Sequence, residues 1–212
     1  MAPEITCEGY ASNHRVYTVN FFGKHISVTV TSSAYIVKKW LSTTIFLRRS
    51  NVGRLVVGVG VQWNPYKDRN DAPGADTLQL CVGCRCLIFQ LSTAARSPLL
   101  LRRFLTDRRN TFVGIHNGSD EIMLMRSDHE LRVHRLLDLR RYVVSEEGES
   151  LVQASVERIV EECLGYVGVR LNPYISTSEW EDYILSDDQV FQACVKAHVA
   201  FRIGKNLRAW NL

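Results

Sequence analysis

Alternating apolar and polar positions define the first predicted elements of the chain. Residues 15–31 alternate on either side of Gly23-Lys24, which predicts a β-hairpin with a short turn. The serines at 32–33 can cap a helix that continues to residue 41. We therefore expect residues 1–50 to form a hairpin and a short helix that pack on the same domain as residues 51–212.

A long apolar run follows at residues 54–63 and is typical of a strand that is buried on both faces of a sheet. We expect this strand to be central. A polar loop at 64–76 leads into two short apolar segments, 77–82 and 86–91, which are hinged at Gly83. The three segments predict three antiparallel strands.

From residue 97 onwards, helical and strand patterns alternate. The pattern predicts helices at 99–105, 120–125, 151–164 and from Ser186 through Arg202 towards Leu207, with strands at 111–116 and 134–139. Gly165 can stop the third of these helices, and Ser186 with Gln189 forms a capping box for the last. The order predicts an α/β domain with a mixed central sheet flanked by helices and an N-terminal β-hairpin extension.

The composition of the chain predicts the size of its hydrophobic core and its cellular compartment. With 212 residues, 46% of them hydrophobic, the chain can build one sizeable core, and it lacks the roughly 18 consecutive apolar residues of a membrane span. The polar N-terminus shows no secretory signal, so we expect an intracellular protein of the nucleus or cytoplasm, with no membrane partner. The six cysteines are then expected to be reduced thiols.

The net charge of +4 is unevenly distributed along the chain. Arginines crowd the middle of the sequence and acids the last third. Because arginine binds phosphate bidentately, nucleic acid is a permitted partner, although a solvated surface of mixed charge explains the pattern equally well. The candidate phosphate contacts are Arg102, Arg103, Arg108 and Arg109.

Five segments resemble one enzyme family. The segments LVVGVGVQWNP, TLQLCVGCRCLIFQL, FVGIHNGSDEIML, LLDLR and QVFQACVKAHVAFRIGKNL are similar, in this order, to the plant Werner-syndrome-like 3′–5′ exonucleases. The resemblance runs from about His14 to the C-terminus. It implies a ribonuclease-H-like fold for residues 51–212 and membership of the superfamily with four acidic metal ligands and a catalytic tyrosine.

The resemblance also locates the catalytic positions, and most of them carry the wrong residue. The first motif, an Asp and a Glu two residues apart, falls on Gly60 and Gln62, and the second motif keeps its acid in Asp120. The third motif, a Tyr and an Asp one helical turn apart, falls on Gln192 and Lys196. One of four acids survives, so the Mg²⁺ or Mn²⁺ expected in the family is predicted to be lost, leaving no cofactor.

These substitutions predict a pseudo-exonuclease that binds single-stranded or 3′-end nucleic acid, or that regulates a partner. We expect Lys196 to fill the metal site and to pair with Asp120. One alternative is an active exonuclease with a rearranged site that recruits Glu121 or Asp138. The other is a pure protein-interaction module, as a homo-oligomer or in a hetero-oligomer with an active relative.

Weaker signals lie around these positions. Trp63 and Asn64 follow the central strand and are candidates either for stacking on a terminal base or for core packing. The spacing of Cys81, Cys84 and Cys86 allows a zinc site, but thiols on a strand, turn and strand are the preferred interpretation because no second close pair of ligands follows. His116 and His198 are expected to flank the former site as packing residues.

Overall fold

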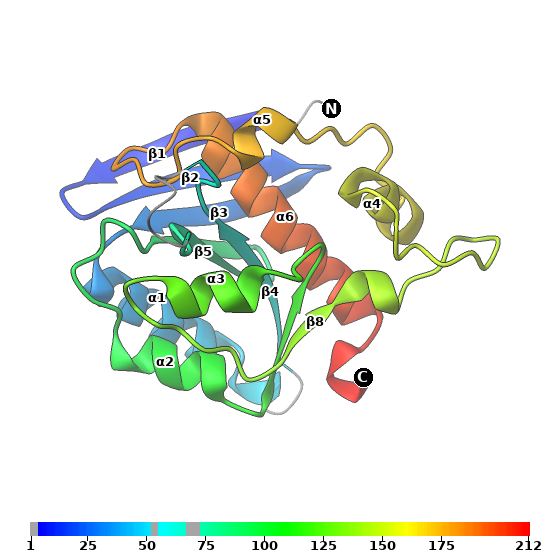
Figure 1. Cartoon of the computed structure of the whole chain (residues 1–212), viewed down its shortest axis with the longest axis horizontal. Coiled ribbons are helices and arrows are strands. Elements are labelled where there is room, and N and C mark those ends of the chain that lie inside the picture. The colour runs from blue at the N-terminus through cyan, green and yellow to red at the C-terminus, as the bar shows by residue number, and fades with distance from the viewer. Residues whose placement is uncertain (1–3, 52–54, 67–72) are drawn as a thin grey trace.

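One mixed sheet forms the centre of the molecule (Figure 1). The computed structural model describes residues 4–51, 55–66 and 73–212. Its strands are β1 (Glu4–Ala11), β2 (His14–Phe21), β3 (Lys24–Thr31), β4 (Leu55–Gln62), β5 (Thr77–Val82), β6 (Arg85–Gln90), β7 (Asn110–Gly114) and β8 (Leu136–Asp138). Residue 54 of the predicted central strand and 67–72 of the predicted loop lie outside the described residues.

The helices connect and cover these strands. They are α1 (Ala34–Leu47), α2 (Leu99–Thr106), α3 (Asp120–Arg126), α4 (Val156–Leu164), α5 (Pro173–Ser176) and α6 (Asp187–Asn206), with short 3₁₀ turns at Arg49–Asn51, Leu139–Arg141 and Ala209–Asn211. No helix in the described part of the chain is both long enough and apolar enough to cross a bilayer.

The strand order is β1-β2-β3-β6-β5-β4-β7-β8. As predicted, β4 lies inside the sheet and β4, β5 and β6 are antiparallel, whereas β7 and β8 continue parallel to β4. The predicted hairpin of β2 and β3 joins the sheet through parallel pairing of β3 with β6. These features confirm the mixed α/β fold.

Several boundaries differ from the prediction, among them the hairpin turn and one end each of two helices. The hairpin turn is at Phe22 and Gly23, one residue early, since both adopt positive φ angles (49° and 70°), as a two-residue turn between twisted strands requires. Helix α1 continues to Leu47, beyond the predicted residue 41. Helix α4 begins at Val156 rather than 151, because the Ser155 hydroxyl accepts a bond from the backbone N–H of Arg158 and caps the helix there.

Two elements were not predicted. Strand β1 is polar and lies at the edge of the sheet, where its side chains alternate only between exposed and half-buried, so its sequence carries little hydrophobic signal. Helix α5 is four residues long and also lacks buried side chains. Its start could have been found, because Asn172 caps the first turn and Pro173 follows at the first helical position.

Helices cover both faces of the sheet (Figure 1). Helix α6 packs on the face of β4 that carries Gly58, where a Cβ would lie 1.9 Å from the backbone oxygen of Ala197. Helix α2 packs on the opposite face, with Phe104 against Phe112 of β7 at a ring distance of 5.7 Å. Helix α1 lies beside α2, and its Trp40 packs under Arg85 of β6.

A candidate active-site cleft

A cavity of about 330 Å³ opens at the C-terminal end of β4. It brings together four of the five positions that the resemblance assigns to the catalytic motifs, from three separate elements. Its lining comprises Val59, Gly60, Val61, Gln62, Trp63, Pro65, Ile115, His116, Asp120, Val156, Ser176, Thr177 and Lys196. Gln192 is not part of this lining and lies one turn before Lys196 on α6.

The floor of the cleft is the face of β4 that carries Gly60 and Gln62. Residues two apart on a strand point to the same face, so both positions are directed into the cavity. Gln79 lies directly opposite Gly60 on β5, and its Oε1 is 2.6 Å from the point that a Cβ on Gly60 would occupy. This buried oxygen accepts no hydrogen bond within the described residues. A glutamine therefore fills the space that an acid at position 60 would need.

Asp120 is the one carboxylate that lines the cavity in the described part of the chain. It is the first residue of α3 and is only 6% exposed. Burial raises its pKa to about 7, against the opposing effect of the Lys196 charge. At neutral pH, this carboxyl is therefore divided between its protonated and ionised forms.

Asp120→Asn tests this environment through stability. Because the pKa of Asp120 is raised on folding, the native state binds the extra proton, and its stability falls as pH rises from about 4 to about 7. The asparagine variant should lose this dependence and be more stable than the native protein at pH 8, by on the order of 4 kcal/mol, since each pKa unit corresponds to about 1.4 kcal/mol. Melting temperatures between pH 4 and 8 measure it. Glu147→Gln, at an exposed acid that does not act on Asp120, should keep the native profile. Parallel profiles for native protein and Asp120→Asn would contradict the prediction.

Helix α6 supplies the cationic side of the cleft. The Lys196 ammonium donates a 3.0 Å hydrogen bond to Ser176 Oγ. Burial lowers the pKa of Lys196, while the charges of Asp120 and Glu157 counteract this shift. The predicted pairing with Asp120 is wrong in its contact, because no ion pair joins these two described residues, although both line the same cavity.

Gln192 holds the α5 segment beside the cleft. Its Oε1 accepts a hydrogen bond from the Asn172 backbone N–H (2.9 Å), and its Nε2 donates to Ser176 Oγ (2.9 Å). Ser176 Oγ thus accepts bonds from both replaced residues of the third motif, Gln192 and Lys196. Nothing in the sequence signals this role for Ser176, because it depends on a contact between segments 20 residues apart.

Several solved structures share the fold that positions this cleft. The catalytic core of RRP6 from Trypanosoma brucei has a TM-score of 0.63 at 13% identity, covering 85% of this chain and 46% of that one. Escherichia coli RNase D, an exoribonuclease involved in structured RNA processing, has a TM-score of 0.61 at 18% identity, with 81% and 42% covered. The Aedes aegypti Nibbler EXO domain gives 0.58 at 15%, with 82% and 84% covered. This is a 3′–5′ exonuclease fold.

The likeness concerns the fold alone, at these identities. The chain spans less than half the length of the RRP6 and RNase D structures that it matches. No family model and no curated protein sequence matches it.

The side chains in the exonuclease-fold cleft do not fit the pair of divalent cations that the family resemblance implies. Hard cations require several anionic oxygens, and here Asp120 is the single carboxylate in the described lining, with a pKa raised to about 7. The Lys196 ammonium in the same cavity repels cations. Gln62 offers only a neutral oxygen, and that of Gln192 already accepts a backbone hydrogen bond.

The two residues after β4 have different surroundings. Trp63 is half-buried and lines the cleft, where its ring can meet a ligand. Asn64 is buried and fully engaged: its backbone N–H donates to Asp76, its Nδ2 to Glu179 (2.8 Å), and its Oδ1 accepts from the Tyr66 N–H. Asn64 therefore holds the strand end in place, and Trp63 is the better candidate for contact with a base.

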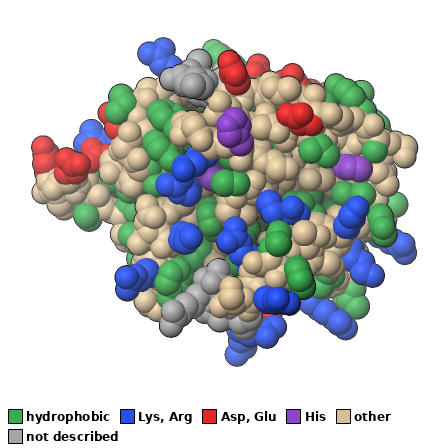
Figure 2. Space-filling model, turned by 180° about the vertical axis from the view of Figure 1, so that it is seen from behind, with side chains coloured by type: hydrophobic (Ala, Val, Ile, Leu, Met, Phe, Trp, Pro, Cys, Tyr) green, Lys and Arg blue, Asp and Glu red, His purple; other side chains and the backbone are tan. Residues whose placement is uncertain are grey.

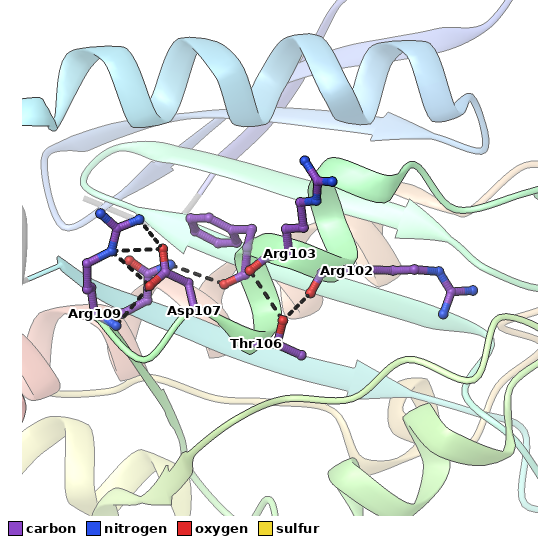
Figure 3. A network of polar contacts seen from close by, with 7 residues as sticks. Arg102, Arg103, Thr106, Asp107 and Arg109 are labelled. Atoms are coloured by element: carbon purple, nitrogen blue, oxygen red, sulfur yellow. Dashed lines mark hydrogen bonds and ion pairs between the residues drawn. The ribbon is translucent and has the colours of Figure 1, made fainter.

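The four arginines predicted as phosphate contacts, Arg102, Arg103, Arg108 and Arg109, lie away from the cleft. They are on or just after α2, near the start of β4, and a rise of about 3.3 Å per residue puts roughly 23 Å between the two ends of this strand. Arg102 donates to the His129 carbonyl (2.7 Å) and Arg109 to the Asp107 carboxylate (2.7 Å). Figure 3 shows Arg103 and Arg102 pointing in different directions from α2. Their role in nucleic-acid binding stays a prediction.

The cysteines lie on a strand, turn and strand, with Cys84 exposed at the turn and Cys81 opposite Cys86. Helix α6 adds Cys194, which hydrogen-bonds to Cys86, and His198, whose Nδ1 is 3.7 Å from Cys81 Sγ. His198 is thus a packing residue, as predicted, but it lies in the core and does not line the cleft, contrary to prediction. Burial lowers its pKa to about 4. Within the described ranges, no three His, Cys, Asp or Glu side chains are arranged to hold a metal ion.

His116 does lie at the cleft, as predicted. It lines the cavity with a positive φ of 57°, and its Nε2 lies 2.9 Å from the Ala154 carbonyl oxygen. Because a carbonyl oxygen only accepts, Nε2 is the donor in this contact, which ties the end of the β7 segment to the loop before α4.

Proposed function

We propose that this domain binds the 3′ end of single-stranded nucleic acid in its cleft and does not hydrolyse it. The observation that carries the proposal is Lys196, an ammonium in the cavity at a position where the resemblance expects a metal-binding carboxylate. A cation on the protein itself can contact a phosphate directly, without a bridging metal. Trp63, on the same cavity, offers a ring on which a terminal base can stack.

Hydrolysis lacks its usual support in this cleft. Divalent ions in two-metal sites generate the nucleophile and stabilise the attacking and leaving oxygens of the displacement. Gly60, Gln62 and Lys196 supply no anionic ligand for such ions. The proposed activity is therefore binding, alone or as the regulator of an active exonuclease.

The alternative of a rearranged active site finds little support in the surrounding acids. Asp138 is engaged by Arg140 in a 2.6 Å ion pair, and hydrogen bonds from this guanidinium help to lower its pKa although burial opposes the shift. Glu121 is exposed on α3. Neither residue lines the cavity, so each would have to leave its present position to bind a metal.

The finer family assignment and the ligand belong to the same proposal. The likeness to plant Werner-syndrome-like exonucleases makes DNA one ligand to test. The description of RNase D as an exoribonuclease involved in structured RNA processing makes RNA the other. We propose an intracellular location, in the nucleus or cytoplasm, where both ligands occur.

Lys196→Gln tests the binding proposal. If Lys196 contacts a phosphate, the variant should bind a labelled single strand more weakly and reduce the slope of log affinity against log salt by about 1. Fluorescence anisotropy in excess chelator measures both quantities, and native binding should persist without divalent ions.

Lys205→Gln is the matched control, since Lys205 is exposed in the last turn of the same helix. Melting temperatures show whether both variants fold. Equal losses in the two variants, or native binding that disappears with chelator, would refute direct contact by Lys196.

A protein partner is the second candidate function. Glu146, Glu147 and Glu149 are exposed on a projection closed by a bridge between Val144 and Ser150 (Figure 1). This acidic projection can meet a basic surface on an active relative or on a second copy of the chain. Failure to bind either nucleic acid at low salt would favour this function over the first.

A further inference from the structure

A second cavity, of about 300 Å³, lies at the opposite end of β4 from the cleft. It is enclosed by the end of α1, the helix α2 and the first residues of β4 and β7. The residues that line it are Ile45, Arg48, Arg49, Leu55, Leu100, Arg103, Phe104, Asp107, Arg109 and Asn110. The proposed binding of a 3′ end in the cleft makes no use of this cavity.

The rim of the second cavity is strongly basic. Arg109 is neutralised by Asp107 through hydrogen bonds to both carboxylate oxygens (Figure 3). The cavity is also lined by three other arginines, Arg48, Arg49 and Arg103. Among the described residues, no ion pair joins their guanidinium groups to an acid. Seen from behind, Lys and Arg side chains gather with hydrophobic ones over the lower half of the molecule (Figure 2). Three positive charges with no acidic partner among the described residues, around one small cavity, favour an anionic ligand.

The interior of the second cavity is apolar. Ile45, Leu55, Leu100 and Phe104 provide hydrophobic lining between the arginines. Beside it, the Arg49 guanidinium lies 4.7 Å from the centre of the exposed Phe46 ring, which makes a flat surface of stacked planar groups. The ligand should therefore carry a planar, weakly polar group as well as its negative charge.

We propose that this second cavity binds a nucleotide, with its phosphate on Arg49 and Arg103 and its base against the apolar lining. Guanidinium groups bind phosphate bidentately and stack on planar rings, so the same side chains suit both parts of the ligand. A volume of about 300 Å³ is at the lower end of pockets that hold small molecules. The nucleotide can be free or can be the end of a strand.

The double variant Arg49→Gln/Arg103→Gln tests the proposal. It should bind a fluorescent mant-AMP probe at least about tenfold more weakly than the native protein, since two phosphate contacts are lost. Arg141→Gln/Arg170→Gln also removes two positive charges, from exposed residues that do not line the cavity, and should bind like the native protein. Unlabelled AMP should displace the probe, whereas adenosine and inorganic phosphate should not, because each lacks half of the ligand.

A labelled pentanucleotide distinguishes the two sources of the ligand. Loss of pentanucleotide binding in the double variant, with no mant-AMP binding by any form, assigns the cavity to a strand end. Lack of saturable binding of both probes, equal losses in Arg141→Gln/Arg170→Gln, or displacement by an acidic peptide in place of AMP would overturn the proposal. Lys196 lines the cleft and not the second cavity, so Lys196→Gln should weaken single-strand binding but leave mant-AMP binding unchanged. Failure of mant-AMP binding is therefore separate from failure of the proposed 3′-end binding.

Discussion

A protein carrying Gly60→Asp, Gln62→Glu, Gln192→Tyr and Lys196→Asp, together with Gln79→Ala, should shorten a labelled single strand from its 3′ end in Mg²⁺ or Mn²⁺. The native protein should leave the strand intact. The gain should be of several orders of magnitude, because the changes complete four carboxylates with Asp120 and add the tyrosine of the third motif. A denaturing gel with a time course measures the ladder of products.

The fifth substitution follows from the packing of β4 against β5. A Cβ on residue 60 would lie 2.6 Å from Gln79 Oε1, so an aspartate there must displace this side chain before it can bind a cation. The variant that keeps Gln79 should therefore be folded but less active than the variant with Gln79→Ala. Activity of the two forms side by side isolates the steric effect.

Two further variants complete this experiment. Adding Asp120→Ala to the active form should abolish the ladder, as should a chelator. If the five-substitution variant unfolds cooperatively but does not shorten the strand, the motif positions are assigned wrongly. The native protein could itself shorten the strand, and this activity could disappear with chelator and with Asp120→Ala. Such a result would show an unusual metal site and would refute the proposed lack of hydrolysis.

The sequence predicts those parts of the fold that are encoded by neighbouring residues. The capping box of Ser186 and Gln189 is present with both of its hydrogen bonds, because the two residues are three apart on one helical turn. The apolar run of β4 identifies a strand that is covered on both faces, because consecutive residues point to opposite faces and nearly all of them are apolar and buried. In the same way, Gly165 ends α4 as predicted, and it does so in the left-handed conformation.

The parts that sequence reasoning missed depend on contacts between distant segments. The space that a side chain at position 60 would need is occupied by Gln79. These two residues are neighbours only because of the register between β4 and β5. The hydrogen-bond partner of the Lys196 ammonium is Ser176, on a different segment from the predicted partner Asp120. His198 belongs to the core because its turn of α6 lies over Cys81 of β5. Local periodicity carries no information about any of these pairs.

Gly58→Ala should lower the free energy of unfolding by about 3 kcal/mol. The added Cβ would lie 1.9 Å from the backbone oxygen of Ala197 and 2.7 Å from the backbone nitrogen of Phe201. Because both atoms belong to the backbone of α6, no side-chain rotation can relieve the contact, and the helix must move away from the sheet. Urea unfolding followed by circular dichroism measures the loss, and an unchanged m-value shows that it comes from stability alone.

Gly9→Ala is the matched control, because Gly9 also lies in a strand but has no atom within 4 Å of an added Cβ. Its free energy of unfolding should stay within about 0.5 kcal/mol of the native value. Since α6 also carries Gln192 and Lys196, the displaced helix of Gly58→Ala should weaken nucleic-acid binding under conditions where the variant is still folded. A Gly58→Ala protein as stable as the Gly9→Ala protein would mean that α6 does not approach β4 this closely, and the geometry of the cleft would have to be redrawn.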